Sequence, residues 1–240
     1  ITGFPCSSLT LIHLWNDLPV GRIGVQSGAI MASMDALEIT IRGKGSHAAK
    51  PNDGVDPIVA SAHVITALQT LISRERNPLD PAILTIGSIH GGTAFNVIPD
   101  EVKLLGTVRT LSDELWEAMP GRVKRMAEGV AAGFGATAEV DYRKMYPVTR
   151  NDPALADRVE ALAQDLVGPG SIIRHQTTLG GEDMSFFLRE VPGCFFFIGS
   201  ANTERGLDHP HHNPRFDFDE EALGIGIEML VRSVESLLAD

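Results

Sequence analysis

Three histidines lie close together near the C-terminal end of the sequence. His209, His211 and His212 occur in a proline-rich loop, which an aromatic and acidic segment follows. Neutral imidazole is the commonest metal ligand among side chains, and a loop after a buried strand is a frequent place for a site. The spacing therefore indicates a metal site, and equally well a solvated histidine cluster that binds metal only casually.

A further histidine, His13, ends a mostly apolar stretch that begins at Leu9. A lone histidine on an apolar strand is more often a buried residue with a hydrogen-bond partner than a ligand. Its place near the carboxyl end of an expected strand is mild evidence for a function.

Polar side chains in two glycine-containing loops and at a strand end could bind an anion. His47 and Asn96 lie in the loops, and Arg109 ends the strand that follows. Together they offer donors for a carboxylate or a developing oxyanion. Taken singly, turn chemistry and a surface arginine explain them.

An acidic residue, Glu182, heads an expected short helix over 182–189. Glu182 either interacts favourably with the positive end of the helix dipole or supports a metal-bound histidine by a hydrogen bond. The sequence contains no glycine-rich phosphate loop and no Gly-x-Ser-x-Gly elbow.

The composition excludes several classes of protein. Of 240 residues, 43% are hydrophobic and 21% charged, which is ordinary for a globular protein. A formal net charge of −11 without a basic run argues against binding to nucleic acid or an anionic membrane. No apolar run approaches ~18 residues, and no signal peptide is visible, so nothing predicts a membrane span or export.

The cysteines and the first residue bear on cellular context. Cys6 and Cys194 are too few for a disulfide framework, which favours a reducing compartment and predicts a cytoplasmic protein. The chain begins with Ile1 rather than Met, which indicates that it was trimmed, processed or cut from something longer.

Residues 33–146 predict a ferredoxin-like domain with the element order strand, helix, strand, strand, helix, strand. The alternation of Leu37, Ile39 and Ile41 predicts the first strand, and Asp56-Pro57 predicts the start of the first helix. Pro120 should kink or split the second helix.

The two ends of the chain, 1–32 and 147–240, predict parts of one α/β layer. The apolar run 194–198 is typical of a strand that is buried on both faces, as in a parallel sheet. So few strands would leave apolar faces bare, and we therefore expect part of the layer to be missing. A final helix is expected from about Glu220. Its inward-facing residues are expected to be Leu223, Ile227, Leu230, Val234 and Leu237.

Taken together, these motifs resemble the M20 metallopeptidase family. The resemblance is to its amidohydrolase branch, which includes hippurate hydrolases, N-acyl-amino-acid amidohydrolases and the auxin-conjugate hydrolases of plants. No single motif is decisive, but the ordered set is specific. The matching stretches are LIHLW (11–15), GKGSHAA (43–49), GVDPI (54–58), GGTAFNVIPD (91–100), GTVRT (106–110), GED (181–183) and HNPRFD (212–217).

The resemblance implies a two-domain metal-dependent enzyme. Residues 1–32 and 147–240 would form the C-terminal part of a catalytic α/β domain, and residues 33–146 an inserted lid that usually forms a homodimer interface. The reaction implied is hydrolysis of the amide bond of an N-acyl amino acid or a related small amide. Two divalent ions, such as zinc, manganese, cobalt or nickel, would serve as cofactors.

The resemblance also implies roles for single residues. His13 and His212 match metal ligands, and His212 is preferred to His211 because the family's His-x-Pro-x-Phe pattern aligns with it. His47 matches a lid histidine that reaches the partner subunit's active site and helps to stabilise the oxyanion. Asn96 and Arg109 match lid residues that hold the substrate's carboxylate or carbonyl, often across the dimer, and Glu182 matches a position without an assigned role.

Some family features are absent or altered. Asn52 stands where many relatives have a second histidine, and Met184 replaces a usual phenylalanine. More importantly, the family's His/Cys/Asp motif and Glu-Glu pair are absent from these 240 residues. A catalytic zinc takes ~3 protein ligands, and a two-metal site takes more.

We therefore expect this chain to be the C-terminal portion of a longer amidohydrolase and to be inactive by itself. Two alternatives stay open. The chain is either a non-catalytic binding or dimerisation module, or one half of a split enzyme.

Overall fold

The computed structural model describes residues 7–239, which form two compact units. Ile1 and Cys6, which carry two of the expectations above, lie outside the described residues. The first unit contains the chain up to Met31, Thr149–Thr178 and the chain from Asp183 onward, and the second unit contains Ala32–Val148 and Leu179–Glu182.

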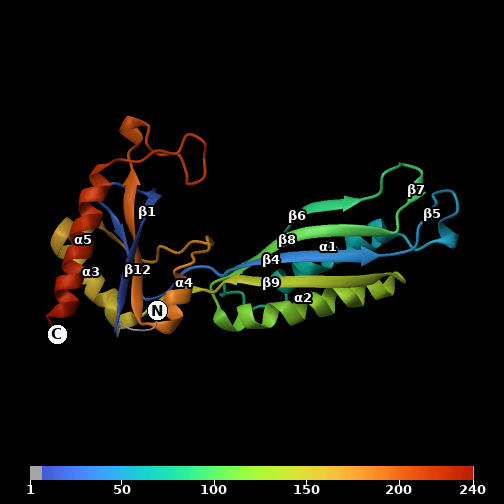
Figure 1. The fold of residues 1–240 in the computed structure, drawn as a ribbon, viewed down its shortest axis with the longest axis horizontal. Coiled ribbons are helices and arrows are strands. Elements are labelled where there is room, and N and C mark those ends of the chain that lie inside the picture. The colour runs from blue at the N-terminus through green and yellow to red at the C-terminus, as the bar shows by residue number, and fades with distance from the viewer. Residues whose placement is uncertain (1–6, 240) are drawn as a thin grey trace. The chain divides into compact units, whose positions relative to one another are not determined.

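The second unit is built on an antiparallel four-stranded sheet in the order β6-β8-β4-β9 (Figure 1). Two long helices of this unit pack on one face of the sheet, because a single hydrophobic core contains residues of both helices and the sheet. The elements follow in the order β4 (Met34–Arg42), α1 (Pro57–Ser73), β6 (Ala82–Gly91), β8 (Glu101–Thr110), α2 (Asp113–Gly133) and β9 (Thr137–Tyr146), with a small hairpin of β5 (Ser46–His47) and β7 (Val97–Ile98).

Side-chain caps define where both helices begin. The Asp56 carboxylate accepts hydrogen bonds from the backbone N–H groups of Ile58 and Val59, so the predicted start of α1 is confirmed. Ser112 caps α2 in the same way. Pro120 does not split α2, which is one continuous helix, and Met119 and Val123 near it are buried in the core.

The predicted alternation in β4 is confirmed. Leu37, Ile39 and Ile41 are almost completely buried and face the helices. Since side chains two residues apart share a face of a strand, Asp35 also points toward this core.

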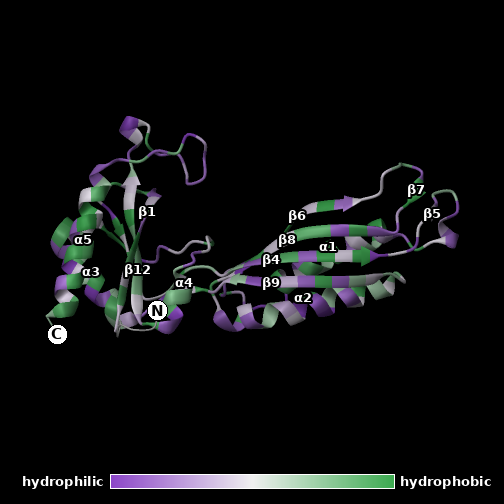
Figure 2. Ribbon diagram, viewed as in Figure 1, coloured by the Kyte–Doolittle hydropathy of each residue, from purple (hydrophilic) through white to green (hydrophobic). Residues whose placement is uncertain are grey.

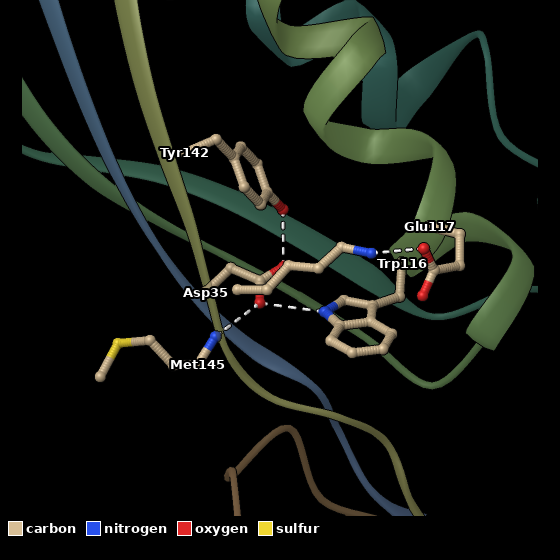
Figure 3. A network of polar contacts seen from close by, with 6 residues as sticks. Asp35, Trp116, Glu117, Tyr142 and Met145 are labelled. Atoms are coloured by element: carbon tan, nitrogen blue, oxygen red, sulfur yellow. Dashed lines mark hydrogen bonds and ion pairs between the residues drawn. The ribbon is translucent and has the colours of Figure 1, made fainter.

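Asp35 is therefore a buried carboxylate, and three donors surround it (Figure 3). Its oxygens accept hydrogen bonds from the Trp116 indole at 2.9 Å, the Tyr142 hydroxyl at 2.7 Å and the Met145 backbone N–H at 3.3 Å. Burial raises the pKa of Asp35, and these hydrogen bonds, together with the charge of Lys144, reduce that rise without cancelling it. The network joins α2, β4 and β9 at one end of the sheet.

The first unit has a mixed sheet in the order β1-β12-β2-β11 (Figure 1). β12 pairs in parallel with β1 and antiparallel with β2. The strands are β1 (Leu9–Pro19), β2 (Ile23–Gly24), β11 (Ile172–Ile173) and β12 (Gly193–Ala201), with a separate pair of β3 (Gly28–Met31) and β10 (Thr149–Asn151). The helices are α3 (Pro153–Val167), α4 (Ser185–Glu190) and α5 (Glu221–Leu238). Short 3₁₀ helices lie at Pro169–Ser171 and Thr203–Arg205 in this unit and at Pro51–Asp53 in the second unit.

The expected burial of β12 on both faces is confirmed. Phe196 and Ile198 pack into a core with α3 and α5, whereas Phe195 and Phe197 pack with Trp15 into a second core on the other face. The pairing of β12 is parallel on one side only, because the short antiparallel strand β2 lies on its other side.

The expected inward face of α5 is wrong for three of its five residues, whereas Leu230 and Leu237 are half-buried. Leu223, Ile227 and Val234 are 46%, 64% and 51% exposed. The helix instead buries small or flexible side chains, since it approaches the sheet so closely that a Cβ on Gly226 would lie 3.1 Å from the Ile12 side chain. Hydrophobic residues recur along α5 (Figure 2), but many of them remain at its surface.

The short helix expected at 182–189 begins later than predicted. α4 spans Ser185–Glu190, so Glu182 precedes it and does not head it. Within residues 7–239, no helix has the length and apolar character that a membrane crossing requires.

Candidate functional site

His13 is held on β1 with one ring nitrogen engaged. Its Nδ1–H donates to the Leu14 carbonyl at 2.5 Å, so the lone pair of Nε2 remains for another partner. A metal-ligating histidine commonly donates its second ring N–H to a backbone carbonyl in this way. Rings of Trp15 and Phe195, at centroid distances of 5.7 and 6.4 Å, fix the orientation of the imidazole.

The His211 ring also contacts His13, at a centroid distance of 5.4 Å. The His211 Nε2 accepts the backbone N–H of Asn16 at 3.1 Å, so this nitrogen already has a partner. Partial burial and the neighbouring His13 lower the pKa of His211, with a smaller contribution from His212 and against the opposing effect of Asp17.

His212 differs from His211 in both exposure and backbone. It is exposed, and its φ of 66° lies in the left-handed region, which non-glycine residues rarely adopt. The family resemblance implies that His13 and His212 are ligands of one metal centre, whereas the ring that the structure places next to His13 is that of His211.

The donor set fits a metal ion only in part. His13 has the fixed ring and the free nitrogen that a ligand needs, and His212 is accessible to solvent. Among residues 7–239, however, no group of three or more histidine, cysteine or acidic side chains is placed to hold a metal ion. These residues therefore fit as part of a site and not as a whole site.

The structure brings His47 and Asn96 together on one hairpin. His47 pairs with Val97 between β5 and β7, and the Ala48 N–H donates to the Asn96 carbonyl at 3.1 Å. The His47 Nδ1 accepts the Ala49 N–H at 3.0 Å, so in the neutral ring the proton lies on Nε2. Both side chains are exposed, and His47 can therefore donate a hydrogen bond to a ligand in solvent.

Arg109 lies at the opposite end of β8 from this hairpin. Eight residues separate Glu101, where the hairpin joins β8, from Arg109, which at roughly 3.4 Å per residue is about 27 Å. Within one chain, a small ligand cannot touch both ends. The guanidinium donates to the Leu179 carbonyl at 2.9 Å, which fixes the segment that leads to Glu182.

Glu182 is half-buried and belongs to the second unit by its contacts. It lies in the segment 179–182, where the Gly180 carbonyl accepts the N–H of Ala32 at 3.0 Å. This segment was expected in the catalytic part of the chain, but its contacts place it with residues 32–148.

Sequence reasoning missed the buried polar residues Asn16 and Asp35. The burial of Asp35 could have been predicted, because Asp35 lies two residues before Leu37 and so shares the inward face of β4 with Leu37, Ile39 and Ile41. The burial of Asn16 has no such pattern in the sequence. The apolar stretch ends just before it, and the pairing of β1 with β12 becomes irregular after Trp15.

The sequence was compared with known protein families. The pattern of peptidase family M20/M25/M40 matches residues 2–236, which is nearly the whole chain. The chain belongs to peptidase family M20/M25/M40.

Relatives in the M20/M25/M40 family include enzymes that act on N-acetylated compounds. N-acetylcysteine deacetylase of Bacillus subtilis is 40% identical over 219 residues, which cover 91% of this chain and 56% of that protein. N-acetyldiaminopimelate deacetylase of Shouchella clausii is 38% identical over 220 residues, which cover 92% of this chain and 57% of that protein.

A crystal structure of a family member from Bacillus subtilis, a dinuclear metal-binding peptidase, is also similar. It superimposes with a TM-score of 0.80 at 34% identity, covering 97% of this chain and 58% of that one. The chain is thus a mixed α/β protein of the M20/M25/M40 fold, and it spans little more than half the length of these relatives.

Proposed function

We propose that this chain is the C-terminal portion of a metal-dependent amidohydrolase that hydrolyses an N-acyl amino acid or a related small amide. The observation that carries the proposal is the family match over residues 2–236. The names of the deacetylases among the relatives support amide hydrolysis as the reaction class.

In this proposal, His13 and His212 contribute to a centre for two divalent ions such as zinc or manganese. The engaged Nδ1 and free Nε2 of His13 support its role as a ligand. The ions, when bound, would polarise the acyl carbonyl and lower the pKa of a water molecule. The remaining ligands and the general base would come from a part of the enzyme that this sequence does not include.

The residues of the second unit would bind the substrate. The Nε2–H of His47 would donate to the developing oxyanion, and Asn96 and Arg109 would hold the substrate's carboxylate or carbonyl. Because Asn96 lies in the hairpin that precedes β8 and Arg109 lies near the far end of β8, we propose that one substrate meets them from two subunits of a homodimer. The split β-α-β unit of residues 33–146 would then act as lid and dimer interface.

Several features support a longer parent enzyme, and one agrees with the proposed cytoplasmic location. The chain spans 56% of the N-acetylcysteine deacetylase, and the described residues hold no complete metal cluster. Large apolar residues of α5 are exposed, as expected of a face that another part of the enzyme covers. The free, buried Cys194 is compatible with a reducing compartment.

The test compares this chain alone with a chimera. The chimera joins the chain to the part of the 40%-identical relative that has no counterpart here. Both proteins are assayed on benzoylglycine and N-acetyl-L-cysteine with added Zn²⁺ or Mn²⁺. We expect no turnover from the chain alone, turnover from the chimera, and loss of that turnover with His13→Ala.

Two results would contradict the proposal. Turnover by the chain alone in the usual range of ~1–10³ s⁻¹ would show that its site is complete. A folded chimera that hydrolyses neither substrate would favour a non-catalytic binding or dimerisation module.

A further inference from the structure

Asn16 has an unusual set of partners for a residue at a strand bulge. It is 5% exposed, and its side-chain amide donates to the carbonyls of His209 at 3.0 Å and Asp217 at 2.8 Å. Its Oδ1 accepts the hydroxyl of the buried Ser200 at 2.5 Å. Both donor hydrogens and the acceptor of the amide are therefore used.

These bonds close a loop. Residues 209–217, here called the histidine loop, contain His209, His211 and His212. The carbonyls of the first and last residues of this loop both accept hydrogen bonds from the side-chain amide of Asn16. A fully satisfied buried amide rigidifies the segments that it joins.

The backbone of Asn16 holds the middle of the same loop. Its N–H donates to the His211 Nε2 at 3.1 Å. The His211 ring also contacts the rings of Trp15 and Phe216, each at a centroid distance of 4.9 Å. His211 is thus fixed by three neighbours, whereas His212 beside it is exposed.

We infer that Asn16 is a positioning residue: it fixes the histidine loop at both ends and through His211, which acts as a brace and not as a metal ligand. The consequence for metal binding, that His212 is the imidazole the loop presents, rests on the function proposed above. Such support of a site by neighbouring hydrogen bonds is a general requirement for placing ligands accurately.

The test uses the chain as it is and the variant Asn16→Asp. This variant keeps the shape of the side chain and the acceptor for Ser200, but it replaces both donors with an oxygen that faces two carbonyls. Arg215 is an exposed residue of the histidine loop, so trypsin cleavage after Arg215 reports on opening of the loop. We expect cleavage to accelerate about tenfold or more, because two buried hydrogen bonds are lost.

Asn151→Asp is the matched control. Asn151 is also a buried amide of the first unit, and it donates to the carbonyls of Gln26 and Phe195 and accepts the N–H of Phe195. The control should lower global stability by a similar amount without accelerating cleavage after Arg215 beyond the global effect. Ser200→Ala, which removes one partner of the Asn16 amide, should give a smaller acceleration at the same bond and serves if Asn16→Asp does not fold.

A spectroscopic signature separates positioning from a merely structural role. In the ¹⁵N NMR spectrum, His211 of the unmodified chain should show an unprotonated Nε2 and a protonated Nδ1. Asn16→Asp should move this signal toward that of a solvent-exposed histidine, and Asn151→Asp should leave it in place. Equal cleavage in the Asn16 and Asn151 variants, or an unchanged His211 signal, would overturn the inference.

Zn²⁺ alone, added to the unmodified chain, distinguishes this inference from the proposed function. A shift of the His13 and His212 signals with the His211 Nε2 unchanged agrees with both. If Zn²⁺ moves neither signal, even in the chimera that supplies the remaining ligands, but Asn16→Asp still opens the loop, the proposed roles of His13 and His212 are wrong and the positioning role stands. Direct binding of Zn²⁺ to the His211 Nε2 would overturn the brace.

Discussion

At the scale of single residues, Arg109 is the side chain whose proposed role is easiest to isolate. Its guanidinium has five N–H donors, so the bond to the Leu179 carbonyl leaves others for a substrate. In the active chimera described above, Arg109→Ala should raise KM by about tenfold for a carboxylate-bearing substrate, because a charge-assisted hydrogen bond is lost. The KM for the matching amide analogue should change little.

The comparison of the two substrates contains its own control for Arg109. Loss of the bond to Leu179 disturbs the segment 179–182 and acts on both substrates alike. Equal increases in KM would therefore assign Arg109 a structural role and remove it from the substrate site.

Cys194 gives a prediction that needs no activity. It is completely buried in β12, and burial, with a smaller effect of Asp152, raises the pKa of its thiol to about 12. Since the thiolate is the reactive form, native Cys194 should not react with Ellman's reagent at pH 8. In a Cys6→Ser variant, where Cys194 is the single thiol, reaction should require denaturant, and rapid labelling of the native chain would contradict its burial.

At the scale of elements, the Asp35 network joins α2 to the paired strands β4 and β9 (Figure 3). Asp35→Asn places an amide NH₂ among N–H and O–H donors. We expect a loss of about 1–3 kcal/mol in the free energy of unfolding, the usual cost of an unsatisfied buried polar group. Urea denaturation measures this loss, and an unchanged midpoint would mean that the amide finds other partners.

The same variant has a predicted pH dependence. Because the pKa of Asp35 is raised in the folded chain, its contribution to stability is complete below the unfolded value of 3.8 and is lost as pH rises through the folded pKa. The stability difference between the original chain and Asp35→Asn should therefore shrink from pH 4 to pH 8. A difference that grows over this range would mean that the donors hold the pKa below 3.8.

Gly199 tests how closely the strands of the first unit approach one another. A Cβ at this position in β12 would lie 2.1 Å from the Pro19 carbonyl oxygen and 3.0 Å from that of Arg22. Both are backbone atoms, so Gly199→Ala should destabilise the chain by about 3 kcal/mol. Thermal unfolding would measure the loss.

Gly224 in α5 is the matched control for this substitution. A Cβ there would meet nothing within 4 Å. Gly224→Ala should stabilise the chain by about 0.5–1 kcal/mol, because alanine is the better helix former. A loss at Gly224 as large as at Gly199 would contradict the close-approach explanation.

At the scale of the whole molecule, the exposed apolar face of α5 distinguishes this chain from a typical monomer. Ile227 and Val234 are 64% and 51% exposed on this helix. Replacing both with Gln should change the free energy of unfolding by no more than about 1 kcal/mol, since neither side chain is in the core. Binding of the dye ANS to the chain should fall, because the dye reports exposed apolar surface.

The matched variant for this prediction is Met229→Gln. Met229 lies on the buried side of the same helix and is completely buried. The Met229→Gln substitution should lower the free energy of unfolding by several kcal/mol, as other replacements of a buried methionine do. Equal losses in the two variants would show that the outer face of α5 is also packed.

Much of the fold could be predicted because its signals are local. The cap at Asp56-Pro57, the alternation of Leu37, Ile39 and Ile41, and the apolar run of β12 each report their element directly. The inward face of α5 could not be predicted, since it depends on how closely Gly226 lets the helix approach Ile12. Residue types alone favoured the larger side chains as the buried ones.

The same division holds for the candidate site. The sequence by itself determined the family, the kinds of element and the residues that could do chemistry, since motifs and periodicity are properties of neighbouring residues. Only the tertiary structure decided which of these residues meet. It placed His211, not His212, against His13, separated Arg109 from Asn96 along β8, and tied the histidine loop to Asn16. Such contacts join residues that are far apart in the sequence, and local patterns carry no information about them.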